Sequence, residues 1–422
     1  MSKWEKIKLK HLTTKIGSGA TPTGGQEAYH DSGISLIRSQ NVLDFGFSNN
    51  GLAFIDEVQA RKLSNVAVEE DDILLNITGD SVARVCKVPS NLLPARVNQH
   101  VSIIRGDTQK VDSDFLLYFL LNPIFKTHLM RLASDGGTRN ALTKSDLENL
   151  LILVPSLNEQ KSIAAILSCL DCKIENLRKQ NETLEAIAQT LFKHWFVDFE
   201  FPNEDGKPYK SSGGKMVRSE LGEIPAVWNV EKMEDLIEVR DGTHDSPKQT
   251  KEGFHLITSK HLKKEGIDFE SAYLISESDY IEVNKRSKVD TYDILLSMIG
   301  TVGILYLVWE QDINFAIKNI GLFKASKNRD YSEYIFLFLS SEYGKTYFKT
   351  RLIGTTQSYL TLSSLREMPL IVPDKAILLG FQQIAKSLFG KSHANNQQIQ
   401  TLAKTRDVLL PKLMSGNLRI TE

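Results

Sequence analysis

Few residues of this chain have the types and the spacing that catalysis requires. Cys169 and Cys172 are spaced like a redox pair or like half of a zinc site, but there is no second pair, and Cys86 falls in a strand-like run. We interpret Cys169 and Cys172 as small packing residues on a helix. Residues 79–83 do not complete a Gly-x-Ser-x-Gly elbow, because alanine stands at the last position. The sequence therefore predicts no metal site and no catalytic nucleophile.

Two other segments lack part of a phosphate-binding or nuclease motif. Residues 17–25 are rich in glycine but do not end in Gly-Lys-Ser/Thr, so they lack the lysine that would reach a nucleotide phosphate. Pro373 and Asp374 are not followed by Glu-x-Lys at a suitable distance, and Asp374 stands where a helix N-cap is expected. We expect no cofactor to bind this chain.

Residues 122–125, Asn-Pro-Ile-Phe, are similar to the Asn-Pro-Pro-aromatic loop that adenine methyltransferases use against the target base. The second proline of that loop is missing, and no glycine-rich strand-to-helix loop suited to S-adenosylmethionine is present. We interpret Pro123 as the residue that stops a helix. Because no catalytic constellation is complete, the sequence favours a recognition or scaffolding protein over an enzyme.

The composition is that of a folded protein with more than one domain. The chain has 422 residues, of which 41% are hydrophobic and 24% are charged, and its formal net charge is -1. Single domains usually hold about 100 to 200 residues, so two or more are expected. No global basic field is available for a polyanion, so a nucleic acid would have to bind local patches. Few cysteines and no long apolar run predict a soluble, cytoplasmic protein without a membrane segment.

The elements that would position any site are duplicated along the chain. The tetrapeptide Asp-Ile-Leu-Leu at residues 72–75 recurs at residues 293–296, and Trp4 has a counterpart in Trp228. The apolar run that ends at Pro155 is answered by a similar run that ends at Pro373. All these matches lie about 220 residues apart, which is too long for a solenoid repeat. The chain is therefore predicted to be two copies of one domain-sized unit.

Each copy changes its character once, at the proline that ends the apolar run. Short apolar runs separated by Gly, Asn, Asp and Pro precede it and predict strands and loops, whereas a long helical pattern follows it. Ser156 and Glu159 have the spacing of a capping box at the start of the first helix. Spacings of three and four predict a coiled-coil seam on both helices, formed by Leu167, Leu170, Ile174, Leu177, Asn181, Leu184, Leu191, Leu388, Ile399, Leu402, Leu409 and Leu413.

Each long helix needs a partner, because about 40 helical residues span about 60 Å. The nearest partner is the helix of the other copy, in an antiparallel pair about an approximate two-fold axis that carries a globular part at each end. The predicted fold is thus α+β, with globular regions 1–156 and 220–374, helical regions 157–200 and 375–422, and a polar, flexible linker 201–219. Asn181 is either a register-setting residue or a tolerated polar one.

Polar segments recur at equivalent places in the two globular regions. The first copy has an Arg-Ser-Gln-Asn run whose side chains suit the edges of guanine and adenine, and the second copy has a lysine-rich run. A Gly-Thr loop also occurs in both copies. From composition alone a solvated loop is as good an explanation as a base-reading one. The candidate DNA-binding residues are Arg38, Ser39, Gln40, Asn41, Thr138, Arg139, Asn140, Lys248, Thr258, Ser259, Lys260, His261, Lys263, Thr355, Thr356 and Gln357.

Taken together and in duplicate order, these motifs resemble those of the specificity subunits of type I restriction-modification systems, over nearly the whole chain. The features that carry the resemblance are the Asp-Ile-Leu-Leu segments, the Thr-Gly of residues 78–79, the Asn-Gln of residues 98–99, the Gly-Thr loops, and the Glu-Gln-x-x-Ile-Ala of residues 159–164. The chain departs from the family pattern at residues 80–81, which are Asp-Ser, and at residues 318–319, which are Lys-Asn.

The resemblance implies a division of labour. Residues 1–156 and 220–374 would be target recognition domains that each read half of a bipartite, asymmetric site in double-stranded DNA. Regions 157–200 and 375–422 would be the conserved helical regions that fix the spacer. Chemistry would belong to methyltransferase subunits that use S-adenosylmethionine and to restriction subunits that use ATP and Mg²⁺ for translocation and cleavage. The alternatives are a coiled-coil scaffold without DNA specificity and a stand-alone DNA methyltransferase.

Overall fold

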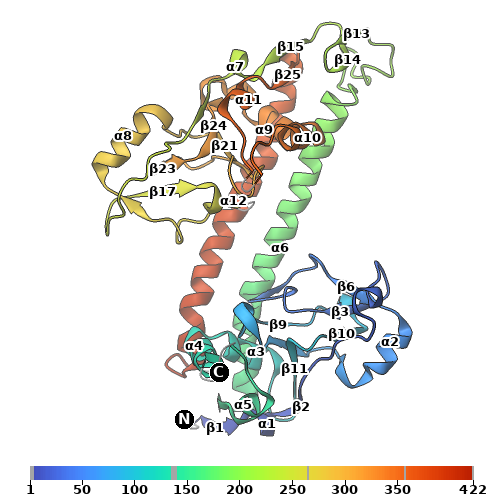
Figure 1. Ribbon diagram of the computed structural model, residues 1–422, viewed down its shortest axis with the longest axis vertical. Helices are drawn as coiled ribbons and strands as arrows, with labels where there is room; N and C mark the ends of the chain where they lie inside the picture. Colours follow the sequence, from blue (N-terminus) through green and yellow to red (C-terminus); the bar gives the residue numbers. More distant parts are fainter. Residues whose placement is uncertain (1–3, 135–139, 264–265, 356–357, 421–422) are drawn as a thin grey trace. The chain divides into compact units, whose positions relative to one another are not determined.

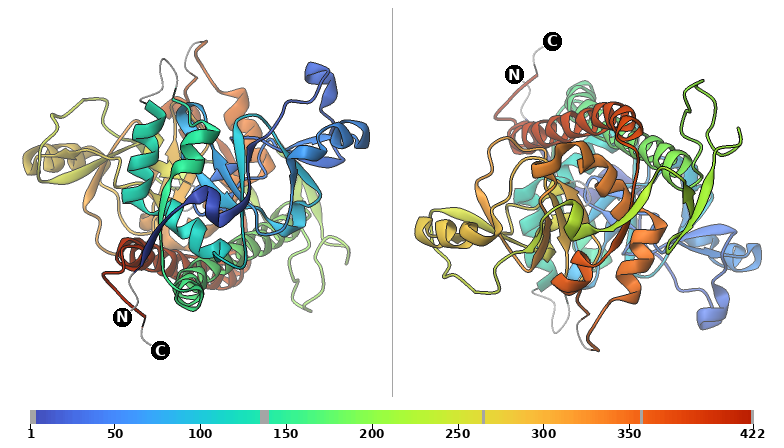
Figure 2. Two further views of the ribbon diagram at one scale, coloured as in Figure 1. Left: turned by 90° about the horizontal axis from the view of Figure 1, so that it is seen from below. Right: turned by 90° about the horizontal axis from the view of Figure 1, so that it is seen from above.

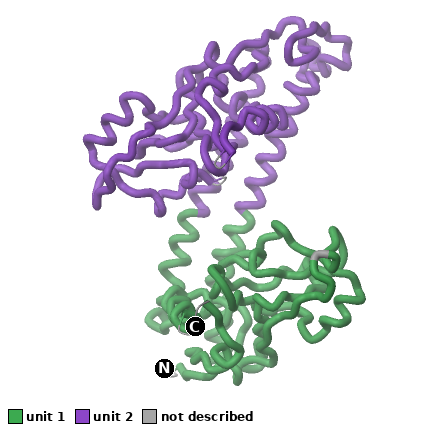
Figure 3. Tube along the Cα trace, viewed as in Figure 1, with its two compact units in different colours: residues 1–176, 400–422 green, residues 177–399 purple. Residues whose placement is uncertain are grey.

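The structure is a computed structural model that describes residues 4–134, 140–263, 266–355 and 358–420. The chain forms two compact units, each made of one globular part and a portion of both long helices (Figure 3). Unit 1 comprises residues 1–176 and 400–422, and unit 2 comprises residues 177–399.

The helices of unit 1 surround short strands (Figure 1). Its helices and 3-10 turns are α1 (Leu9–Leu12), η1 (Gly25–Ala28), α2 (Glu57–Lys62), η2 (Ser64–Val66), η3 (Gly79–Ser81), η4 (Ser90–Leu92), α3 (Ser113–Leu121), α4 (Pro123–Ser134) and α5 (Lys144–Asn149). Its strands are β1 (Glu5–Lys8), β2 (Thr13–Ser18), β3 (Ile34–Ile37), β4 (Val42–Leu43), β5 (Gly46–Phe47), β6 (Ala53–Ile55), β7 (Ala67–Val68), β8 (Ile73–Asn76), β9 (Val85–Lys87), β10 (Ala95–Val97), β11 (Val101–Gly106) and β12 (Leu151–Val154).

Unit 2 repeats most of these elements; among its described residues it adds the hairpin β13-β14 and has no counterpart of β7 in its second sheet. Its helices and 3-10 turns are α7 (Met233–Leu236), η5 (Ser259–His261), α8 (Glu277–Ser287), η6 (Ala325–Tyr331), α9 (Ser332–Ser340), α10 (Glu342–Thr350) and α11 (Leu362–Arg366). Its strands are β13 (Met216–Ser219), β14 (Gly222–Pro225), β15 (Asn229–Lys232), β16 (Val239–Asp241), β17 (Phe254–Thr258), β18 (Leu262–Lys263), β19 (Gly266–Ile267), β20 (Leu274–Ile275), β21 (Ile294–Ser297), β22 (Leu305–Leu307), β23 (Phe315–Lys318), β24 (Ile320–Phe323) and β25 (Pro369–Val372).

The sheets confirm the predicted duplication. Unit 1 has an antiparallel sheet in the order β2-β11-β8-β9, and unit 2 has the same arrangement in β16-β24-β21-β22. A second sheet contains one parallel pair in each unit, β3 with β10 and β17 with β23. The pairs β1-β12 and β15-β25 close the two copies in the same way.

The Ile-Leu-Leu of the repeated segment lies in an inner strand of each four-stranded antiparallel sheet, β8 in unit 1 and β21 in unit 2. Ile73 and Leu75 face one core of unit 1 and Leu74 faces another, so side chains are buried on both faces of β8. A strand covered on both faces requires a continuous apolar run rather than an alternating one. The strand begins next to a buried aspartate in each copy. Arg105 pairs with Asp72, and Lys324 pairs with Asp293.

The two long helices, α6 (Leu157–Phe196) and α12 (Lys375–Met414), run antiparallel within each unit. In unit 1, Arg406 Nη1 donates to Asp171 Oδ1 at 2.7 Å. In unit 2, Asn181 Nδ2 donates to Asn396 Oδ1 at 2.7 Å, and the rings of Phe192 and Phe381 are 6.3 Å apart. None of the predicted seam residues is exposed. The predicted fold class, duplicated α+β parts with a pair of antiparallel helices, is confirmed.

Helix ends show where the local predictions succeeded and failed. Asp374 caps α12 as expected, since Ala376 N donates to Asp374 Oδ1 at 2.8 Å. Helix α3 ends at Leu121 with Asn122 as its C-cap, and Pro123 is the first residue of α4, which confirms that a helix ends at this proline. The capping box is half right: Glu159 N donates to Ser156 Oγ at 3.4 Å, but the Glu159 carboxylate binds Arg419 instead of the cap backbone.

Two other expectations were wrong. The segment predicted as a flexible linker is folded, because the ring of Phe201 stacks on Tyr209 and Trp228 at 4.6 and 4.7 Å and β13 pairs with β14 (Figure 2, right). Cys169 and Cys172 are exposed rather than packed, because both point away from the seam of α6. Buried aromatic side chains, which are few in flexible segments, were the signal in the linker.

Candidate nucleic-acid interface

The Arg-Ser-Gln-Asn run forms a tight turn directly after β3, and Asn41 lies inside it. Arg38 N donates to Asn41 Oδ1 at 3.0 Å, and Asn41 Nδ2 donates to Ser48 O at 2.8 Å. The Asn41 side chain is fully buried. Its amide satisfies backbone groups that the turn would otherwise leave unpaired. Asn41 was expected to face DNA, and the structure instead makes it a turn-closing residue.

His261 has the same role in unit 2. Thr258 N donates to His261 Nδ1 at 2.9 Å, and the imidazole is fully buried. Burial lowers the pKa of His261, and the nearby Lys260 lowers it further. The expectation that His261 contacts DNA is corrected for the same reason as for Asn41. An asparagine and a neutral histidine can both accept the amide hydrogen at this turn, which explains why these unlike residues recur there.

Arg38 and Gln40 remain available on the surface side of the turn. Arg38 is half-buried, and one nitrogen of its guanidinium donates to Gly51 O. Gln40 is exposed, and its Nε2 also donates to Gly51 O, at 3.0 Å. Ser39 is held from behind, because Asn76 Nδ2 donates to Ser39 O at 2.8 Å. The turn is therefore fixed to the end of β8 and to the loop after β5.

In unit 2 the corresponding turn presents lysines. Lys260 and Lys263 are exposed, and Lys263 Nζ donates to Lys260 O at 2.8 Å. Lys248 is exposed on the segment before β17. Ser259 is buried and donates through Oγ to Asn319 O at 3.0 Å, and Thr258 is half-buried. Of the predicted residues in this turn, the lysines are thus the ones placed to meet a ligand.

In each unit the structure places the second predicted loop beside the end of the strand that contains Ile-Leu-Leu, which is β8 in unit 1 and β21 in unit 2. Gly79 N, just after β8, donates to Asn140 O at 3.0 Å. In unit 2 an isolated bridge joins Ile299, just after β21, to Tyr359. Asn140 and Thr355 are exposed. Thr138, Arg139, Thr356 and Gln357 lie outside the described residues.

Sequence reasoning missed several polar residues at these strand ends. His100 Nδ1 is 2.6 Å from Thr78 Oγ1, and Gln99 is exposed beside it. Arg84 is exposed on the turn between β8 and β9. In unit 2, His244 Nδ1 is 2.8 Å from Asn319 Oδ1. The signal that could have found them is adjacency to the repeated Asp-Ile-Leu-Leu strand.

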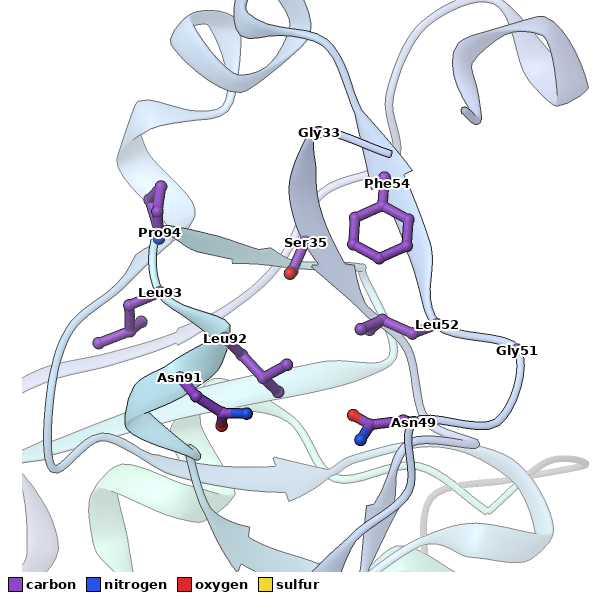
Figure 4. A pocket seen from close by; sticks show the side chains of 10 residues that line it. All are labelled: Gly33, Ser35, Asn49, Gly51, Leu52, Phe54, Asn91, Leu92, Leu93 and Pro94. Atoms are coloured by element: carbon purple, nitrogen blue, oxygen red, sulfur yellow. The ribbon is translucent and has the colours of Figure 1, made fainter. Parts of the chain in front are cut away.

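Unit 1 has a hollow where unit 2 has aromatic rings. The hollow has a volume of about 490 Å³ and is lined by residues of β3, β6, η4 and the loop after β5 (Figure 4). Ser35 in β3 and His255 in β17 hold equivalent register positions. In unit 2 the ring of Phe269 packs against His255 with 5.3 Å between centroids. In unit 1 the position of Phe269 is taken by Asn49, whose amide lies across the hollow from Asn91.

The two units share one α+β fold and carry different side chains on the same turn and loop. This arrangement is typical of a protein that binds two different targets. The family model described as the type I restriction modification DNA specificity domain matches residues 1–186 and 225–403. The chain belongs to this family. As a member of the specificity-domain family it is a specificity subunit of a type I restriction-modification system and not one of the catalytic subunits.

Similar proteins cover the whole chain. The type I restriction enzyme MjaIX specificity subunit of Methanocaldococcus jannaschii is 29% identical over 99% of this chain and 94% of its own length. The HindI specificity subunit of Haemophilus influenzae is 24% identical over 99% of this chain and 100% of its own length. The crystal structure of the type I S subunit from M. genitalium matches with a TM-score of 0.58 and 17% identity, over 97% of this chain and 96% of that one. This last likeness shows the shared fold.

Three further observations concern a buried thiol, metal ions and membranes. Burial raises the pKa of the Cys86 thiol to about 12. Within the described ranges, no three His, Cys, Asp or Glu side chains are grouped to hold a metal ion. In the same part of the chain, no helix combines the length and apolar character needed to cross a membrane.

Proposed function

We propose that this specificity subunit reads a bipartite, asymmetric site in double-stranded DNA, with each unit reading one half. The observation that carries the proposal is the repeated strand end, where unit 1 presents Arg38 and Gln40 and unit 2 presents Lys260 and Lys263. Arginine and glutamine can pair with base edges, and lysine can bind a phosphate or the edge of a guanine. A shared frame with different side chains is what two different half-sites require.

The long helices supply the spacing between the half-sites in this proposal. Both α6 and α12 contain residues of unit 1 and of unit 2, so each helix continues from one unit into the other. A helix has a fixed rise per residue, so the number of helical residues sets the distance that the helix spans. The predicted domain boundaries, 1–156, 157–200, 201–219, 220–374 and 375–422, assign reading to the globular regions and spacing to the helices.

The partners in the proposal are methyltransferase and restriction subunits that this chain directs to the site in the cytoplasm. They supply the chemistry: S-adenosylmethionine for methyl transfer, and ATP with Mg²⁺ for translocation and cleavage. This chain supplies the sequence specificity that directs those subunits to the site. No step of that chemistry is assigned to its own residues.

The experiment that tests the function is sequencing of modified bases in DNA from cells that carry the methyltransferase gene with or without this chain. The expected result is a two-part methylated motif with a constant gap that appears only when this chain is present. A DNA-binding titration of the purified complex runs in parallel. If neither a motif nor sequence-dependent binding is found, the scaffold alternative replaces the proposal, and methyl transfer by this chain alone would favour the enzyme alternative.

Charge replacement in unit 2 gives a prediction of its own. Lys260→Gln and Lys263→Gln should each weaken binding equally on cognate and scrambled DNA, and each should reduce the slope of log K against log salt by about one. The measurement is a salt titration of the purified complex. Lys285→Gln is the matched control, because that exposed lysine on α8 pairs with Glu282. An unchanged slope in both turn variants would exclude these lysines from the phosphate contacts.

A further inference from the structure

The hairpin formed by β4 and β5 follows the recognition turn of unit 1, defined as residues 38–41, and its tip rests on α12. Phe45 at the tip has a φ of 58°, which is unfavourable for a residue with a Cβ. Its ring lies 3.5 Å from the guanidinium carbon of Arg406, measured to the ring centroid. A strained backbone persists only where its surroundings hold it, so this contact is a fixed part of the unit.

The rest of the hairpin is also held at both ends. At the tip, Asp44 accepts a hydrogen bond from Lys126 of α4 and another from Val85 N at 3.2 Å. At the base, Ser48 N donates to Asn41 O at 2.8 Å. The hairpin is therefore a short, stiff connection between the recognition turn and the helix α12.

Arg406 joins this connection to both long helices. Its side chain is only 11% exposed. Nη1 donates to Asp171 of α6 at 2.7 Å, and Nη2 donates to Asp407 at 2.9 Å. Tyr118 of α3 donates its hydroxyl to the other oxygen of Asp171, also at 2.7 Å. A leucine at this buried position would pack without the cost of desolvating a charge, so packing alone does not account for the arginine.

Unit 2 fastens its globular part to α12 by a different contact. The ring of Trp309 stacks on that of His393 with centroids 6.0 Å apart. Gly390 lies under the same indole, where an added Cβ would be 3.7 Å from it. Both units thus fasten the globular part sideways to α12, and they use unrelated side chains to do so.

We propose that Arg406 is a positioning residue that fixes the recognition turn of unit 1 on the paired helices through Phe45, and so sets how strictly the gap between the half-sites is measured. The inference rests on the proposed function. It predicts that loosening this contact widens the range of accepted gaps and leaves the sequences of both half-sites unchanged.

The test uses the complete complex of this chain with its methyltransferase subunits and a plasmid library in which the gap is one base pair shorter, equal to or one base pair longer than the native one. Arg406→Met keeps the length of the side chain and removes the charge and the planar fork. The ratio of methylation at the native gap to that at the neighbouring gaps should fall at least tenfold. Lys404→Met, an exposed residue on the same helix, should leave the ratio unchanged.

A second variant, Phe45→Gly, tests the contact between Phe45 and Arg406 without removing the buried charge of Arg406. Glycine relieves the positive φ and removes the ring, so the variant loses the contact without added backbone strain. Its ratio should fall as in Arg406→Met, and this variant decides the matter if Arg406→Met does not fold. A native ratio in a folded Phe45→Gly complex overturns the inference. Absence of any two-part motif with the unmodified chain would instead defeat the proposed function.

Discussion

Lys324→Met should lower the free energy of unfolding of unit 2 by about 3 to 5 kcal/mol, the usual cost of breaking a buried ion pair by removing one partner. Lys324 is 4% exposed and lies beside Asp293, whose side chain is fully buried. Its Nζ also donates to Asp290 Oδ2 at 2.7 Å and to Lys288 O at 3.0 Å. Methionine fills the space but leaves the carboxylate of Asp293 without a counter-charge.

Urea denaturation followed by tryptophan fluorescence measures this loss. Trp195, Trp228 and Trp309 lie in unit 2, whereas Trp4 alone lies in unit 1, so the signal reports mainly on unit 2. Lys288→Met is the matched control, because Lys288 is 67% exposed and should change stability by no more than about 0.5 kcal/mol. A double variant with Asp293→Asn should recover part of the loss, because asparagine removes the unpaired charge and keeps a side-chain acceptor beside the amides of Asp290 and Ser326. A loss below about 1 kcal/mol in Lys324→Met would refute the buried-pair account.

The same cluster predicts a pH dependence. Burial alone would raise the pKa of Asp290, but its hydrogen bonds to Lys324 and Lys288 outweigh burial and hold the pKa below its ordinary value. A carboxyl with a depressed pKa contributes stability above its unfolded value of about 3.9 and loses it as the pH falls through the folded value. The difference between the native chain and Lys324→Met should therefore shrink as the pH is lowered from about 5 to about 3.

The strands and helices that depend on long patterns could be predicted from the sequence. The Asp-Ile-Leu-Leu segments are apolar at every strand position, so they could only be covered on both faces. The seam residues of α6 and α12 repeat over many turns, and each repeat adds to the same signal. Contacts that depend on one distant residue gave no such signal. Glu159 binds Arg419, which no local pattern connects with it.

The candidate site could be predicted only in part, for a chemical reason. Side chains that read base edges carry the same donors and acceptors as side chains that close turns. Asn41 and His261 recur at one position because the turn needs an acceptor there, whereas Gln40 and Lys260 at the preceding position point outward. A position that has the same structural role in both copies therefore belongs to the shared fold. An exposed position that differs between the copies, such as that of Gln40 and Lys260, is a candidate for contact with DNA.

Lengthening both long helices by one heptad should lengthen the gap in the modified site by one to about three base pairs and leave both half-sites unchanged. Seven residues add about 10.5 Å at the rise of an α-helix, against about 3.4 Å per base pair. The larger value applies if the helices run parallel to the DNA. A heptad also returns each seam residue to its original face, so the pairing of the helices is preserved.

The insertion belongs after Asn176 in α6 and after Ile399 in α12, where each helix passes from one unit into the other, so the contacts of Asn181 with Asn395 and Asn396 stay within unit 2. Both helices must change together. A heptad in α6 alone would displace Phe192 from Phe381, whose rings pack together in the core of unit 2, and should abolish methylation rather than move the gap. Modified-base sequencing reads both results. A folded, active double insertion with the native gap would show that the helices do not measure the spacing, because the insertion changes the length of the helices and leaves the globular part of each unit as it is.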